Sequence, residues 1–252
     1  MKNSTICALS KVPEVTLTFW IIKIAATTLG ETGGDVVSMS MNLGYLIGTL
    51  IFAAIFLVAV FAQIKMRGFH PLPYWMTIIA TTTVGTTLAD FADRSLGIGY
   101  AGGSLVLFSL VMASLFIWYR SLGAISVDTV ITPKAEMFYW TTIMFSQTLG
   151  TALGDWTADS AGLGYQGSAI VFSALLALIA AAYYWTAISR TVLFWMAFIL
   201  TRPLGAVVGD FLDKPTSGGG LALSRYSASA ILLAFILICI LLFEHKAAKQ
   251  NH

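Results

Sequence analysis

The chain has 252 residues, of which 58% are hydrophobic and only 10% are charged, with a formal net charge of +2. Its mean hydropathy is +0.83, which excludes a soluble domain of this length and predicts a polytopic membrane protein with the lipid bilayer as its partner. The two cysteines, Cys7 and Cys239, lie at opposite ends and give neither a disulfide framework nor a thiolate metal site.

The first predicted element is an apolar helix that begins near Val15 and contains FWIIKIAATTLGETGGD from Phe19. A second apolar run follows at Leu43–Ile64. The same pair recurs three times, as YWMTIIATTTVGTTLAD from Tyr74 with Leu105–Tyr119, YWTTIMFSQTLGTALGD from Tyr139 with Ala169–Ile188, and FWMAFILTRPLGAVVGD from Phe194 with Ala228–Phe243. Most runs approach the ~20 residues that cross ~30 Å of hydrocarbon as a helix. We therefore predict an all-α membrane protein with eight transmembrane helices.

Four anchors define the repeat: a Trp, a Gly ten residues later, an Asp fifteen residues later and a second Gly at plus 24. The anchors are Trp20, Trp75, Trp140 and Trp195; Gly30, Gly85, Gly150 and Gly205; Asp35, Asp90, Asp155 and Asp210; and Gly44, Gly99, Gly164 and Gly219. The Trp-to-Trp steps of 55, 65 and 55 residues indicate two duplicated halves. We expect one transmembrane domain over 1–252, with repeats at about 15–65, 73–120, 135–189 and 190–244 and a cytoplasmic linker at 121–136.

Two helices per repeat give every repeat the same orientation, so the four repeats are expected to be parallel. Loop cations predict which end faces the cytoplasm. One side carries Lys2, Lys11, Lys65, Arg67, Arg120, Lys134, Arg190, Lys246 and Lys249, and the other carries Arg94, Lys214 and Arg225. Both termini are therefore expected in the cytoplasm. We interpret the four repeat Trp residues as an aromatic belt at the cytoplasmic interface.

The repeat glycines have two possible roles. Small residues let helices approach closely, and this role alone accounts for Gly30, Gly85, Gly150 and Gly205. Glycine and proline can also interrupt a helix beside a binding site. The GETGGD stretch and Pro203, two residues before Gly205, keep interruption open for the first and fourth repeats.

A polar stripe is expected on each Trp-containing helix, because positions 3, 7, 11 and 15 after the Trp share one face. The stripes are Lys23, Thr27, Glu31 and Asp35; Ile78, Thr82, Thr86 and Asp90; Ile143, Gln147, Thr151 and Asp155; and Phe198, Arg202, Ala206 and Asp210. If these helices form an inner ring, the stripes converge on one axis. We predict ion binding by Glu31, Asp35, Asp90, Asp155, Asp210, Thr27 and Gln147, because intramembrane acids mark ion or proton paths.

The remaining acids of this region, Asp93, Asp159 and Asp213, follow the motifs in turn-like sequences, and we interpret them as solvated turn residues. Lys23 and Arg202 are expected to act as counter-ions for the buried acids; the alternative is that they hold an anionic substrate. No histidine lies in any motif, and oxygen-only ligands suit Mg, Mn or Ca rather than Zn or Cu. Glu31 and Asp35 are the candidate metal ligands.

The motif residues resemble a bacterial membrane-protein family built from four tandem repeats of unknown function, each with two membrane segments and a characteristic Trp. Trp20, Trp75, Trp140 and Trp195 carry the likeness, together with the Gly and Asp of each motif, over residues 14–244. The resemblance implies a bacterial inner-membrane protein and supplies no activity. The fourth repeat departs from the pattern after Asp213, where KPTSGGG replaces the SLGIGY-type turn.

These features together predict a transporter of a small cation, a divalent metal such as Mn, Mg or Ca, with proton coupling through intramembrane carboxylates. Two alternatives remain open: a transporter or binder of a small organic or anionic solute that uses Lys23 and Arg202, and a non-transport scaffold or sensor. No nucleophile–base pair, phosphate loop or nucleotide fingerprint is visible, so we expect neither an enzyme, a cofactor nor a nucleic-acid partner. The sequence gives no oligomeric state.

Overall fold

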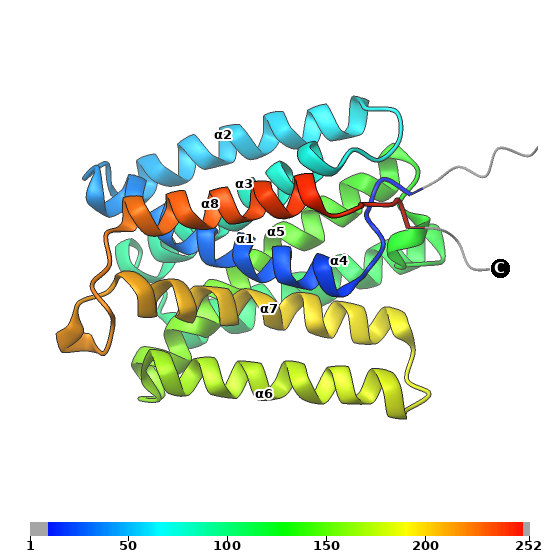
Figure 1. The fold of residues 1–252 in the computed structure, drawn as a ribbon. Helices are drawn as coiled ribbons and strands as arrows, with labels where there is room; N and C mark the ends of the chain where they lie inside the picture. The colour runs from blue at the N-terminus through cyan, green and yellow to red at the C-terminus, as the bar shows by residue number, and fades with distance from the viewer. Residues whose placement is uncertain (1–9, 249–252) are drawn as a thin grey trace, which may run out of the picture.

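The structure, a computed structural model, describes residues 10–248, so Lys2, Cys7 and Lys249 lie outside the described residues. Within that range it contains eight α-helices and no β-strand, which confirms the predicted all-α class. The helices are α1 (Leu17–Asp35), α2 (Gly44–Lys65), α3 (Pro71–Asp90), α4 (Tyr100–Leu122), α5 (Pro133–Asp155), α6 (Gly164–Trp185), α7 (Arg190–Asp213) and α8 (Arg225–Leu242). They run side by side along one direction (Figure 1).

The helices form two concentric layers. The first helices of the four repeats close an inner ring, in which α1 packs on α3 and α7, and α5 packs on the same two helices. The second helix of each repeat packs outside, against the first helix of the next repeat: α2 on α3, α4 on α5, α6 on α7, and α8 back on α1. The repeats are therefore arranged cyclically around one axis, and the fourth repeat closes the circle on the first.

Local chemistry fixes where the helices begin. Thr16 accepts a hydrogen bond from the Phe19 amide at the start of α1, and Thr132 does the same for Ala135 at the start of α5. α5 begins at Pro133, and α4 extends to Leu122. The segment expected as a linker, 121–136, is therefore helical at both ends, because a threonine cap and a proline at the first helical position start a helix there.

The second glycine of the repeat stands at the start of the outer helix in the first three repeats, whereas Gly219 of the fourth follows a 3-10 turn and precedes α8 by six residues. Gly44, Gly99, Gly164 and Gly219 all have positive φ values, from +65° to +86°. A side chain would be strained in that conformation, so the plus-24 anchor is the residue that permits the turn between the two helices of a repeat.

The first glycine of each repeat is a close-approach point between neighbouring helices. A Cβ atom on Gly30 would overlap Thr82, one on Gly85 would lie 2.9 Å from Gln147, and those on Gly150 and Gly205 would overlap Arg202 and Thr27. In every case the partner is the residue seven positions after the Trp of the next repeat. The four ring helices are continuous α-helix through these glycines and through Pro203, so interruption, which the sequence left open, does not occur.

Eight aromatic rings close one end of the inner ring; we call them the aromatic collar. Each repeat contributes its Trp and the residue before it, and that preceding residue contacts the Trp of the next repeat. The contacts are Phe19–Trp75, Tyr74–Trp140, Tyr139–Trp195 and Phe194–Trp20, with ring centroids 5.4, 5.7, 6.3 and 5.9 Å apart. Trp75, Trp140 and Trp195 are buried. The expected lipid-facing belt is therefore wrong for these three residues, because the collar buries them between the helices.

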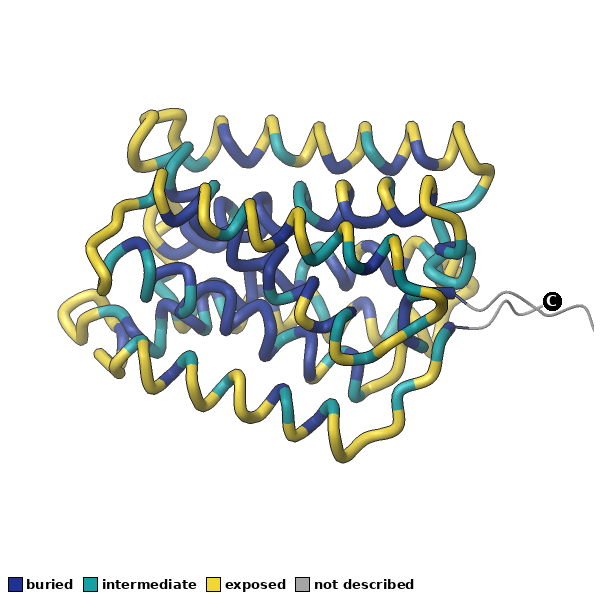
Figure 2. Tube along the Cα trace, turned by 90° about the horizontal axis from the view of Figure 1, so that it is seen from above, coloured by how far each residue is buried: buried dark blue, intermediate teal, exposed yellow. Residues whose placement is uncertain are grey.

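Burial follows the two layers. It concentrates on the inner helices, while the outer helices expose one side along their length (Figure 2). Five helices, α2, α4, α6, α7 and α8, are long and apolar enough to cross a membrane. The polar stripes lower the hydropathy of the other ring helices, which are of similar length and lie inside the bundle. The chain is thus a helical membrane protein with lipid-facing outer helices.

The two ends of the described chain meet near the collar, at what we call the terminal end of the bundle. Pro13 and Ala247 form an isolated antiparallel bridge, and Glu14 donates its amide hydrogen to the Lys246 carbonyl. The opposite end, where the ring helices reach their aspartates, is the acidic end. There α1, α3 and α5 each continue into a single π-helical turn, at Val36–Ser40, Phe91–Ser95 and Trp156–Ser160.

Candidate functional site

The four polar stripes line the axis of the inner ring. Their sixteen members, at positions 3, 7, 11 and 15 after each Trp, are at most 3% exposed. The stripes therefore form four successive levels between the aromatic collar and the acidic end. They include every residue predicted to bind an ion, as well as both buried cations.

Arg202 joins all four ring helices at the third level. Its Nη2 atom lies 3.0 Å from Oε2 of Glu31 on α1. The same nitrogen donates to Thr86 on α3 and Thr151 on α5, at 2.5 Å each. Thr86 also donates to the Gly30 carbonyl at 3.1 Å. Arg202 therefore serves as a counter-ion for Glu31 and ties the ring across its axis.

The carboxylates meet at the acidic end. One oxygen each from Glu31, Asp35 and Asp90 lies within 4.8 Å of the other two, and the same holds for Asp35, Asp210 and Asp213. All five residues are buried. Asp35 belongs to both groups, so the two sets are continuous. Asp155 completes the level on α5, 3.5 Å from the Arg94 guanidinium.

Three cations cap these carboxylates. Arg94 bridges Asp90 (2.8 Å) and Asp155 (3.5 Å). Lys214 bridges Asp35 (2.5 Å) and Asp210 (3.1 Å). Arg225 lies 2.9 Å from Asp213 and 3.6 Å from Asp35. The acidic end is therefore closed by a lid of ion pairs made of these three cations.

The lid cations remain charged because the acids surround them. Burial by itself would lower the pKa of the Lys214 ammonium, but the charges of Asp210 and Asp35 outweigh it and hold that pKa above its ordinary value. Burial would also lower the pKa of the Arg94 guanidinium, but the charges of Asp90 and Asp155 outweigh it and raise that pKa. Both side chains thus supply permanent positive charge over the carboxylates.

The structure corrects the interpretation of one turn acid and adds residues that we did not predict. Asp213 is buried and paired with Arg225 instead of solvated, because α7 continues to that residue. Asp159 is exposed and Asp93 is half-buried. The lid roles of Arg94 and Lys214 were missed, although each lies four residues after a motif aspartate, the spacing that pairs side chains on a helix.

A second group of stripe residues, at the first two levels, has polar atoms without partners. Lys23 is fully buried, and its Nζ lies 4.1 Å from the centroid of the Phe198 ring. Three of these residues have buried polar atoms without a hydrogen-bond partner among residues 10–248: Lys23 (Nζ), Gln147 (both amide atoms) and Thr82 (the hydroxyl). Thr27, by contrast, donates to the carbonyls of its own helix and of Thr201.

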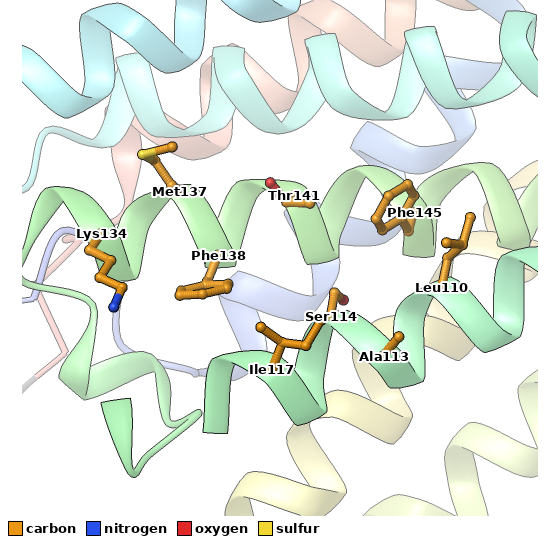
Figure 3. A pocket seen from close by; sticks show the side chains of 9 residues that line it. All are labelled: Leu110, Ala113, Ser114, Ile117, Lys134, Met137, Phe138, Thr141 and Phe145. Atoms are coloured by element: carbon orange, nitrogen blue, oxygen red, sulfur yellow. The ribbon is translucent and has the colours of Figure 1, made fainter. Parts of the chain in front are cut away.

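A groove of ≈ 410 Å³ lies between α4 and α5, outside the ring. Its lining is apolar, with Leu110, Phe138 and Phe145 along it and Lys134 at one end (Figure 3). No carboxylate is among its lining residues. It therefore offers none of the chemistry found on the axis.

Comparison with known proteins identifies the repeats. Four segments, residues 18–69, 73–123, 138–189 and 193–245, match the family described as a Repeat of Unknown Function (DUF347). Each segment contains most of one ring helix and all of the outer helix that follows it. No curated protein and no solved structure matched the chain.

Proposed function

We propose that this chain, which belongs to the family defined by the DUF347 repeat of unknown function, transports a small cation across the membrane. The observation that carries the proposal is the group formed by Glu31, Asp35 and Asp90, whose oxygens lie within 4.8 Å of one another inside a membrane protein. Intramembrane carboxylates are costly and mark ion or proton paths. The cargo is a divalent metal of the Mn, Mg or Ca type, and the coupling ion is the proton.

The ligand chemistry supports a hard divalent ion. The group offers oxygen atoms only, which suit Mg, Ca and Mn. Asp35 Oδ1 and Asp90 Oδ2 are buried and have no hydrogen-bond partner among the described residues, so each aspartate has a free oxygen. An ion bound by the two carboxylates could use these free oxygens as ligands.

The neighbouring cations provide a means of exchange. Arg202 pairs with Glu31, Lys214 with Asp35 and Arg94 with Asp90, so a protein cation neutralises each of the three ligands. An arriving metal ion competes with these side chains for the negative charge of the same carboxylates. Protons compete in the same way, because a carboxylate must be deprotonated to bind a metal. This shared competition is the physical basis for the proposed coupling.

The axis supplies a route with a closure at each end, the aromatic collar at one and the ion-pair lid at the other. We assign the terminal end to the cytoplasm of a bacterial inner membrane, because Lys65, Arg67, Arg120 and Lys134 flank the helix ends there. Ions would then enter or leave on the extracytoplasmic side through the lid, and on the cytoplasmic side through the collar.

Flux into proteoliposomes tests the proposal. Purified protein is reconstituted, Mn²⁺, Mg²⁺ or Ca²⁺ uptake is followed with an internal metal dye, and internal pH is recorded in parallel. We expect uptake of at least one metal with proton movement, and its loss in Glu31→Gln and Asp90→Asn. Asp159→Asn is the matched control, because Asp159 also lies at the acidic end but is exposed. This variant should transport normally.

Two results would contradict the proposal. Absence of flux for all three metals, with correctly folded protein in the vesicles, would exclude transport of this cation class. Normal flux in both Glu31→Gln and Asp90→Asn would exclude the assigned carboxylates as the site.

A further inference from the structure

The first two levels of the stripes hold a buried lysine that no carboxylate neutralises. Lys23 is fully buried, and no acid lies within 4.0 Å of its Nζ in the described part of the chain. The positive charge of Arg202 acts on it repulsively. The first three levels of the stripes carry two cations, Lys23 and Arg202, but one carboxylate, Glu31, which Arg202 already binds.

Burial and the charge of Arg202 both oppose the positive charge of Lys23, so a bound anion would stabilise the ammonium. The Phe198 ring presents its face to the Nζ atom at 4.1 Å, and aromatic faces attract cations. The Phe198 ring does not neutralise the charge of the Lys23 ammonium, however, and it is no full hydrogen-bond acceptor for the three N–H groups. The charge and the donors are therefore available to a ligand.

Other unpartnered groups occupy the adjacent level. Gln147 on α5 and Thr82 on α3 are fully buried, and neither the amide atoms of the one nor the hydroxyl of the other is hydrogen-bonded. Both belong to the set that packs against the repeat glycines, so they lie at one height in the ring, four residues beyond the Lys23 level. Buried polar atoms without partners are costly, and here they come from three different ring helices.

We propose that Lys23, Gln147 and Thr82 form a binding site for a small monovalent anion, separate from the carboxylates of the acidic end. One uncompensated ammonium neutralises one negative charge. Ile78 and Ile143 stand at the same level as Lys23 and are fully buried, so the walls are apolar and favour a weakly hydrated ion. Sulfate and phosphate, with two charges and strong hydration, are poor occupants.

The inference goes beyond cation transport, because it gives the middle of the axis a ligand of opposite sign. A chain that binds an anion beside Lys23 and a metal ion beside Asp90 moves less net charge when both travel together. The two sites can be tested independently, since they share no residue.

Anion binding by the purified full-length protein tests this site. Chloride, nitrate and acetate are titrated as sodium salts at constant ionic strength, and affinity is measured by calorimetry and by the shift of the thermal transition. We expect at least one of them to bind and to raise the transition temperature, with sulfate giving no shift. In Lys23→Met binding should be lost, and in Gln147→Met it should weaken about tenfold.

Lys65→Met is the matched control. Its Nζ also lies over an aromatic ring, at 5.3 Å from the Phe61 centroid, but the residue is exposed, so anion binding should be unchanged. Asp90→Asn should also retain anion binding, even if it loses metal flux. If Lys23→Met does not fold, Gln147→Met decides the question, because it keeps the lysine.

Three outcomes would overturn the inference. The first is the absence of binding for all three anions in the wild-type protein. The second is anion binding of equal strength in wild type and Lys23→Met, or in wild type and Gln147→Met. The third is a Lys23→Met variant that is more stable than wild type in every salt, with no anion effect on either protein, which would identify Lys23 as a neutral packing group.

Discussion

Arg202 on α7 and Glu31 on α1 form an ion pair across the axis of the ring, with 3.0 Å between Nη2 and Oε2 and essentially no solvent exposure of either side chain. The two residues are 171 positions apart in sequence. The pair connects the first and fourth repeats at the place where the circle closes. It also occupies one of the proposed ion ligands, so it links the stability of the fold to the proposed function.

Breaking this pair from one side should be strongly destabilising. Arg202→Met leaves Glu31 buried without a counter-ion, and we expect a loss of about 3–5 kcal/mol in the free energy of unfolding. The double variant Glu31→Gln with Arg202→Met removes both charges and should be more stable than Arg202→Met alone. Reversible unfolding in mixed detergent micelles measures both values. Additive effects of the two single substitutions would contradict a direct interaction.

The close approach of α5 and α7 should depend on Gly150. In Gly150→Ala the new methyl group overlaps the buried side chain of Arg202 and lies 3.0 Å from Pro203 Cδ, so we expect a loss of about 1–3 kcal/mol from overpacking. Gly33→Ala is the control, because its methyl group would meet its nearest neighbour, Leu29, at 3.9 Å. That variant should be neutral or gain up to about 1 kcal/mol. Equal stability of the two variants in the same unfolding assay would exclude a packing role for Gly150.

Closure of the circle by α8 can be tested by cross-linking. Ser229 on α8 donates a hydrogen bond to Thr32 on α1, with 2.9 Å between the oxygens. Cysteines at both positions, in a Cys7→Ser and Cys239→Ser background, should form an intramolecular disulfide on mild oxidation, detected by mass spectrometry after proteolysis. The pair of Thr32→Cys with Ser227→Cys serves as control, since Ser227 is exposed. Equal cross-linking of both pairs would contradict the docking of α8 on α1.

Removing a lid cation should strengthen metal binding. In Lys214→Gln, Asp35 and Asp210 lose the ammonium that now bridges them, so a metal ion no longer competes with it. We expect Mn²⁺ affinity, measured by calorimetry, to rise about tenfold, which corresponds to about 1.4 kcal/mol. Lys246→Gln is the control, because that side chain is 53% exposed and, among residues 10–248, forms an ion pair with Glu244 alone. Unchanged or weaker affinity in Lys214→Gln would show that Lys214 does not compete for the ligands.

The sequence alone determined the class of the protein, its four repeats and the polar face of each ring helix. Hydropathy predicts spans because lipid offers no hydrogen bonds to an open backbone, and four anchors in register reveal a repeat. Helical phase placed Lys23, Thr27, Glu31 and Asp35 on one side of α1, since 3.6 residues per turn brings every fourth residue back to the same face. These properties depend on residues that are near one another along the chain.

Only the tertiary structure decided which helix lies beside which. The same glycines were compatible with packing or with a broken helix until Gly205 was found against Thr27, the partner from the first repeat. The same tryptophans were compatible with a lipid-facing belt until the ring buried Trp75 and Trp140. Periodicity fixes the face that a helix presents, but not the neighbour that covers it. That neighbour comes from a distant part of the chain and is selected by the fit of small residues against larger ones.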